Sequence, residues 1–186
     1  MSNRSLIILM GYTTLILFPL VAILVLYFVS GSWQFIFKNG WPIYAQIPIG
    51  IALGLAIGLG LREMLKTKPF AELTHKYAGF LGDFELSRPE YVFLSVCAGV
   101  GEEILFRGCI QYYAGIVPTA IIFVAMHGYL NPFDRWVTVY GIVLTAIFIG
   151  VGYVMAFSGI YVCIILHIVI DVILFGHLLS SQKNKI

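Results

Sequence analysis

Long apolar runs, interrupted by charges, Pro and Gly, dominate the hydrophobic pattern of this chain. A membrane-crossing helix needs about 20 mostly apolar residues. Cutting the chain at its interruptions gives six candidate spans, approximately residues 6–29, 42–61, 91–114, 118–129, 136–157 and 160–179. The fourth is short for a crossing, because turn-forming residues stand on both sides of it, at Pro118 and at Asn131-Pro132. The pattern predicts an all-α, polytopic membrane helical bundle of about six transmembrane helices.

Residues 62–90 form the one substantial polar segment between the predicted spans. Apolar side chains recur in it at three- and four-residue steps, at Phe70, Leu73, Tyr77, Phe80, Leu81 and Phe84. This spacing predicts an amphipathic helix at the cytoplasmic interface, as a surface strut or as a moving lid over a site. We expect one membrane-embedded domain, with two N-terminal transmembrane helices (1–61), this amphipathic segment (62–90), a catalytic four-helix core (91–179) and a short cytoplasmic tail (180–186).

Two local features add detail to the membrane prediction. Gly50, Gly54 and Gly58 recur at four-residue intervals and form a small-residue face, which favours close helix packing over a functional site. For six crossings, nine Lys and Arg residues fall on one side of the membrane: Arg4, Arg62, Lys66, Lys68, Lys76, Arg88, Arg135, Lys183 and Lys185. Only Lys38 falls on the other side. The positive-inside rule therefore predicts that both termini are cytoplasmic.

Composition excludes several classes of protein. Hydrophobic residues make up 60% of the chain and charged residues only 11%, whereas soluble domains carry about a quarter charged residues. A net charge of +2 provides no basic surface for nucleic acid, so we expect no nucleic-acid partner. Cys97, Cys109 and Cys163 are isolated in apolar runs, and their spacing fits neither a disulfide framework nor a zinc knuckle.

Six polar residues inside the predicted spans are the candidates for function: Glu102, Glu103, Arg107, His127, His167 and Asp171. Ionisable residues at this depth are costly, and they are by default functional hypotheses that face the bundle interior. Counting residues from the predicted span ends, at 1.5 Å each, puts Glu103, Arg107 and the last three of the set at similar depths of about 10–17 Å. One layer near the middle of the membrane could hold them all.

Helical spacing suggests roles within this layer. Glu103 and Arg107 are four residues apart and can pair on one helix face, which allows an arginine to be buried. Glu102 lies about 100° around the helix from Glu103, so it is free to act with His127 as a base that takes a proton from water. The carboxylate of Asp171 could orient His167 in the next turn, or either side chain could contact a ligand. The cysteines and serines in these spans have no base at useful spacing, so a hydrolase built from this layer would use activated water.

These motifs resemble those of the CPBP family, the CAAX prenyl proteases and bacteriocin-processing proteins that are also called the Abi family. Residues 102–107 (EEILFR) match its E-E-x-x-x-R motif, residues 123–127 (FVAMH) match F-x-x-x-H, and residues 167–171 (HIVID) match H-x-x-x-N/D. The resemblance covers residues 91–176. It implies a glutamic-type intramembrane peptidase with Glu102 as general base, His127 as its partner, Glu103 and Arg107 shaping the site, and His167 and Asp171 stabilising the oxyanion.

One departure bears on specificity. In prenyl proteases the last motif position is typically Asn, whereas an ionised Asp171 would repel an oxyanion. Either Asp171 is protonated or it orients His167. We expect a small prokaryotic cell-membrane enzyme, with no cofactor and no metal, that cleaves a membrane-associated peptide or protein with or without a prenyl group. The alternatives are a zinc protease that uses His127, His167 and a carboxylate, a non-enzymatic bacteriocin-immunity or interaction protein, and a proton-linked carrier.

Overall fold

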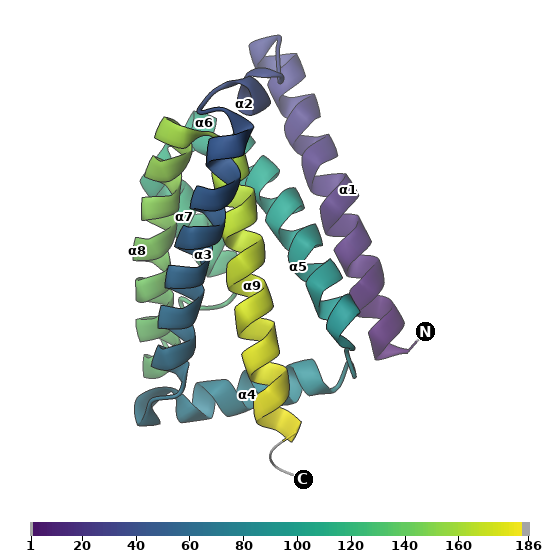
Figure 1. Ribbon diagram of the computed structural model, residues 1–186, viewed down its shortest axis with the longest axis vertical. Helices are drawn as coiled ribbons and strands as arrows, with labels where there is room; N and C mark the ends of the chain where they lie inside the picture. The colour runs from purple at the N-terminus through teal and green to yellow at the C-terminus, as the bar shows by residue number, and fades with distance from the viewer. Residues whose placement is uncertain (1, 184–186) are drawn as a thin grey trace.

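The computed structural model describes residues 2–183, and every regular element among them is a helix (Figure 1). Lys185, which we counted among the cations of the cytoplasmic side, and the end of the predicted tail lie outside the described residues. The helices are α1 (Asn3–Ser30), α2 (Phe35–Lys38), α3 (Ile43–Leu65), η1 (Lys68–Phe70), α4 (Ala71–Gly82), α5 (Arg88–Glu103), η2 (Ile104–Ile110), α6 (Gln111–Ala114), α7 (Ile116–Met126), α8 (Arg135–Ser158) and α9 (Ile160–Lys183).

Four helices of the described chain are long and apolar enough to cross a membrane. They are α1, α3, α8 and residues Ile160–Ser181 of α9. The predicted all-α membrane bundle is therefore confirmed, while the other two candidate spans have distinct forms. The predicted span 91–114 is helical throughout but consists of α5, a π-helix (η2) and α6. The predicted span 118–129 becomes α7, a helix of only 11 residues.

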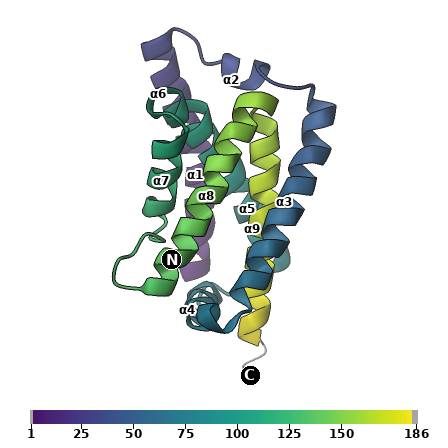
Figure 2. The same cartoon turned by 90° about the vertical axis from the view of Figure 1, so that its left-hand side faces the viewer.

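Helix α9 is the central element of the bundle. It packs most extensively against α3 and α5, and it also contacts α4 and α8. Helix α1 lies on the outside of the bundle against α5 and η2, and Figure 2 shows it behind α7 and α8. The apolar side chains of α1 are mostly exposed, as expected for a surface that faces lipid tails.

Helix α4 crosses one end of the bundle, roughly perpendicular to the long helices, and the start of α1 and the end of α9 lie at this end (Figure 1). Leu73 and Leu81 of the predicted apolar face are buried, whereas Phe80, which the spacing assigned to the same face, is exposed. The hydroxyl of Thr74 donates a 2.8 Å hydrogen bond to the carbonyl of Leu65, the last residue of α3. This bond and the buried face attach α4 to the bundle.

The start of α5 is fixed by interactions at the same end. Ser87 and Glu90 form a capping box, with Pro89 in the first turn. Arg4, near the start of α1, donates a 2.7 Å hydrogen bond to Glu90. The hydrogen bonds from Arg4 and Ser87 hold the pKa of Glu90 at about 2, so this link between α1 and α5 persists throughout the physiological pH range.

The predicted small-residue face of α3 packs directly against α9. A Cβ atom added at Gly54 would lie 2.7 Å from the Cβ of Val169 and 2.8 Å from the carbonyl oxygen of Leu166. Both neighbours belong to the α9 helix, and a backbone carbonyl cannot move aside cheaply. Close approach of these two helices therefore requires glycine at this position.

Replacing Gly54 by Ala is expected to lower the free energy of unfolding by about 1–3 kcal/mol through overpacking between α3 and α9. Gly60→Ala, on the same helix, is the matched control, because a Cβ there has no neighbour within 4 Å. The control should be neutral or stabilising by up to about 1 kcal/mol, because Ala favours the helix over Gly. Thermal unfolding of both variants in detergent micelles measures the difference, and equal stabilities would contradict the packing account.

Candidate functional site

The first motif lies where α5 passes into the π-helix η2. Glu102 and Glu103 are the last residues of α5, and Arg107 is in the middle of η2. A π-helix is wider than an α-helix and is rare, and such segments occur frequently at functional sites. The acidic pair directly precedes this wide turn, and its side chains approach His127, which follows α7, and His167 of α9.

Glu103, Arg107 and His167 form a buried ionic cluster. The predicted pair is present, with Arg107 Nε 3.2 Å from Glu103 Oε2. The other carboxylate oxygen of Glu103 accepts a 2.7 Å hydrogen bond from His167 Nδ1 on α9. Both side chains of the Glu103–Arg107 pair are at most 1% exposed. Glu103 therefore joins η2 to α9 and fixes the orientation of the His167 ring.

Two phenyl rings hold the guanidinium of Arg107. Its central carbon lies 4.5 Å from the ring centroid of Phe123 and 4.7 Å from that of Phe148. The rings come from α7 and α8, so one buried cation connects three elements. Cation–π contacts gain strength when they are shielded from water, which helps to compensate for burial of the charge.

His127 comes directly after α7, where the helix ends at Met126. Gly128 follows in the left-handed conformation, with φ of 76°, which glycine adopts without strain and which commonly ends a helix. The Nδ1 atom of His127 lies 2.7 Å from the carbonyl oxygen of Phe123. A carbonyl can only accept, so Nδ1 must donate, and Nε2 is directed to the other side of the ring.

Glu102 stands between two imidazole rings. Its Oε2 atom lies 3.7 Å from His127 Nε2 and 3.9 Å from His167 Nε2. Its side chain is 15% exposed, whereas that of Glu103 is fully buried. The two adjacent glutamates therefore have different surroundings, since Glu103 is bonded inside the bundle while Glu102 borders open space.

Asp171 approaches the same ring of His167 from one turn further along α9. Its Oδ2 atom is 3.6 Å from His167 Nε2, beyond hydrogen-bonding distance. The orienting carboxylate of His167 is thus Glu103, on the opposite ring nitrogen. The structure brings all six candidate residues together across α5, η2, α7 and α9, with Glu103 and Arg107 behind the other four.

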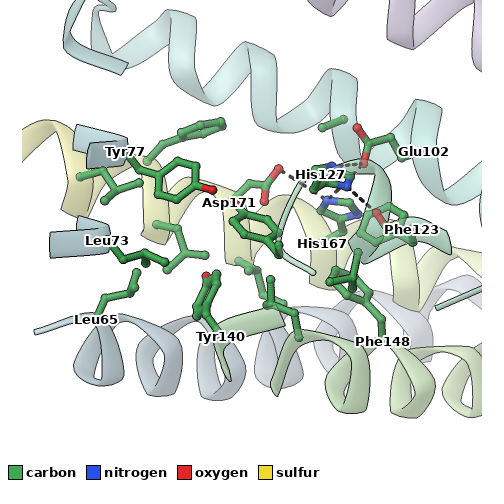
Figure 3. Close-up of a pocket in the computed structure, with 18 residues that line it drawn as sticks. Leu65, Leu73, Tyr77, Glu102, Phe123, His127, Tyr140, Phe148, His167 and Asp171 are labelled. Atoms are coloured by element: carbon green, nitrogen blue, oxygen red, sulfur yellow. Dashed lines mark hydrogen bonds and ion pairs between the residues drawn. The ribbon is translucent and has the colours of Figure 1, made fainter. Parts of the chain in front are cut away.

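A cavity of about 250 Å³ opens beside this cluster. Glu102, His127, His167 and Asp171 line one part of it, and Figure 3 shows these four side chains converging. The remaining wall comes from α3, α4, α7, α8 and α9, and most of it is apolar. Helix α4 contributes Leu73 and Tyr77 to this wall.

Aromatic residues of the cavity were missed by the sequence reasoning. Tyr129 and Tyr140 stand near predicted span ends, a position that is typical of residues in a membrane-interface belt. Instead both line the cavity, where their ring centroids are 5.2 Å apart, and Tyr140 is only 4% exposed. Phe148, which clamps Arg107, also went unnoticed. The one sequence signal for Phe148 is its four-residue spacing from Leu144 and Tyr140, which puts the three side chains on one face of α8.

Histidine and carboxylate side chains, such as those of this cluster, can also bind metal ions. Among the described residues, no group of three or more His, Cys, Asp or Glu side chains is arranged to hold a metal ion. His127 and His167 approach the same oxygen of Glu102 rather than a shared point away from it.

Comparison with known proteins identifies one family and one relative. Residues 85–173 match the family model described as type II CAAX prenyl endopeptidase Rce1-like, and all three motifs lie within this range. The match confirms the resemblance predicted from the motifs. The uncharacterized protein YpbD of Bacillus subtilis (strain 168) is 26% identical over 136 residues, which cover 72% of this chain and 70% of YpbD. No solved structure gives a significant match.

Proposed function

We propose that this chain, whose residues 85–173 match the family model of Rce1-like CAAX-type proteases, is a glutamic-type intramembrane endopeptidase. The family implies a protease, and the apolar helices place it in a membrane. The proposal adds the chemistry, in which Glu102 and His127 activate the attacking water. It also adds the orientation, with the end that carries α4 and both termini facing the cytoplasm. Similarity to a Bacillus subtilis protein supports the prokaryotic assignment.

The position of Glu102 between two imidazoles supports this chemistry best. Separations of 3.7 and 3.9 Å are too long for direct hydrogen bonds but suit groups bridged by one water molecule. The Glu102 carboxylate would take a proton from that water, and the oxygen would attack the carbonyl carbon of the substrate. The proton on Glu102 then passes to the leaving amine as the C–N bond breaks.

The oxyanion of the intermediate needs a hydrogen-bond donor. His167 would supply it from Nε2 as an imidazolium, since its Nδ1–H already donates to Glu103. Its charge would be balanced by the three neighbouring carboxylates of Glu102, Glu103 and Asp171. In this scheme Asp171 faces the imidazole, so it need not contact the oxyanion that it would repel.

The substrate we propose is a membrane-associated peptide or protein, prenylated or not. Quantitative proteomics of membranes from cells carrying wild type or Glu102→Gln at equal expression tests the function. A peptide fragment that forms only with the wild type supports the proposal. Identical fragment profiles in the two membranes, with the protein folded and abundant, would contradict it.

Asp171→Asn is expected to lower the cleavage rate by about tenfold or less. When the carboxylate that orients a catalytic histidine becomes an amide, the loss is about 10⁴-fold. Here Glu103 performs that orientation through a 2.7 Å bond, and Asp171 stands 3.6 Å from the other nitrogen. Initial rates on the substrate found by proteomics measure the effect. A loss of a thousandfold or more would show that Asp171 acts directly.

A further inference from the structure

The cavity has two chemically different ends. The carboxylates and imidazoles lie together at one end, and Figure 3 shows Leu65 and Leu73 at the other, with Tyr77 and Tyr140 nearer the middle. Leu174, Phe175 and Leu178 of α9 add further apolar surface. Among the residues that the structure describes, no Lys or Arg lines the cavity. A group that extends from the reacting centre toward α4 therefore meets apolar side chains.

The apolar end is closed by packed side chains. Leu65 and Leu73 are 3% and 5% exposed and belong to the main hydrophobic core, together with Phe70. The ring of Phe70 packs against those of Trp136 and Tyr140, with centroids 5.4 and 6.5 Å apart. Because α4 is also hydrogen-bonded to the end of α3, the wall cannot recede easily. The side chains of this wall are therefore held in place.

The volume limits what can occupy this end. A cavity of about 250 Å³ has room for roughly eight water-sized groups. The peptide group under attack takes up part of this space near Glu102. The remainder fits one amino-acid side chain of intermediate size, and the apolar lining disfavours a charged one.

We propose that this end is a specificity pocket for one apolar side chain adjoining the scissile bond, and that Leu73 of α4 sets the size accepted. The inference rests on the proposed function and names the substrate class of the same site. It also gives α4 a role beyond that of a surface strut, because α4 forms the wall that limits the size of the substrate side chain. Discrimination between side chains that differ by one methylene in such a pocket is about 10- to 200-fold.

Two peptide libraries test the proposal, one prenylated and one unprenylated, each with every residue type flanking the scissile bond. Full-length protein in lipid nanodiscs cleaves them, and mass spectrometry locates the cleavage. Leu73→Ala should shift the preference toward larger apolar side chains and Leu73→Phe toward smaller ones, each by about tenfold or more in relative kcat/KM. Leu65→Ala, on α3, enlarges the same end independently and should act like Leu73→Ala. Thermal unfolding confirms that each variant is folded.

Leu61→Ala is the matched control, since Leu61 is equally buried one turn earlier on α3 but does not line the cavity. Its cleavage profile should equal that of the wild type. Three outcomes would overturn the pocket proposal. They are unchanged preferences in both Leu73→Ala and Leu65→Ala, a wild-type preference for charged side chains, and cleavage confined to prenylated peptides. Absence of any Glu102-dependent cleavage would instead reject the proposed function, so the two failures are distinguishable.

Discussion

Glu102→Gln is expected to lower kcat for peptide hydrolysis by about 10²- to 10⁴-fold, the usual contribution of a general base. The amide has nearly the same size as the carboxylate but cannot take a proton from water. The side chain borders the cavity, and its separation of 3.7 Å from His127 is too long for a hydrogen bond. Folding should therefore be almost unchanged, and KM should change much less than kcat.

Steady-state kinetics of purified protein in nanodiscs, on the substrate identified by proteomics, measures this loss. Glu72→Gln is the matched control, because Glu72 is an exposed carboxylate on α4 that does not line the cavity. It should retain the wild-type rate. Should Glu102→Gln cleave within a fewfold of the wild type, Glu102 is not the base, and a residue of a different chemical type must activate the water.

Arg107→Met is expected to lower the free energy of unfolding by about 3–5 kcal/mol, the cost of breaking a buried ion pair by removing one partner. Glu103 would keep a buried charge with only His167 beside it. The variant would also lose the guanidinium that joins the rings of Phe123 and Phe148. Denaturant titration in micelles, followed by the fluorescence of the Trp residues, measures the change.

The double variant Arg107→Met with Glu103→Gln isolates the charge effect. It should be more stable than Arg107→Met alone, because no unpaired carboxylate remains and the Gln oxygen can still accept from His167. Arg88→Met, an exposed cation at the start of α5, serves as the control and should change stability by less than about 0.5 kcal/mol. If Arg107→Met proves as stable as the control, the buried pair does not support the fold.

Features set by helical periodicity could be predicted from the sequence. The four-residue spacing of Glu103 and Arg107 predicted their pairing, and the apolar steps along 70–84 predicted most of the buried face of α4, with Phe80 as the exception. The depth estimate also succeeded in bringing His127 and His167 to Glu102, because rise per residue is nearly constant among membrane helices. Local geometry alone decides each of these features.

Features that depend on neighbouring helices could not be predicted. Burial of Tyr140 against the cavity depends on where α8 stands relative to α4 and α9, which no pattern within α8 encodes. Gln46 gives a second example. Its amide donates to the carbonyl of Trp41 and accepts from the backbone of Val162, linking the start of α3 to the first turn of α9. Such a long-range bond leaves no periodic signal, and the residue attracted no attention in the sequence.

Substitutions and deletions within the π-helix η2 are expected to have different effects on the site. A substitution between Ile104 and Ile110 alters one side chain, whereas deleting one residue would favour a return to the α-helical repeat. In an α-helix each residue accounts for about 100° of rotation and 1.5 Å of rise. A deletion between Glu103 and Arg107 would shorten their spacing from four residues to three, and so move Arg107 around the helix relative to Glu103 while both residues remained present. The length of this segment is therefore as much a requirement of the site as the identity of its residues.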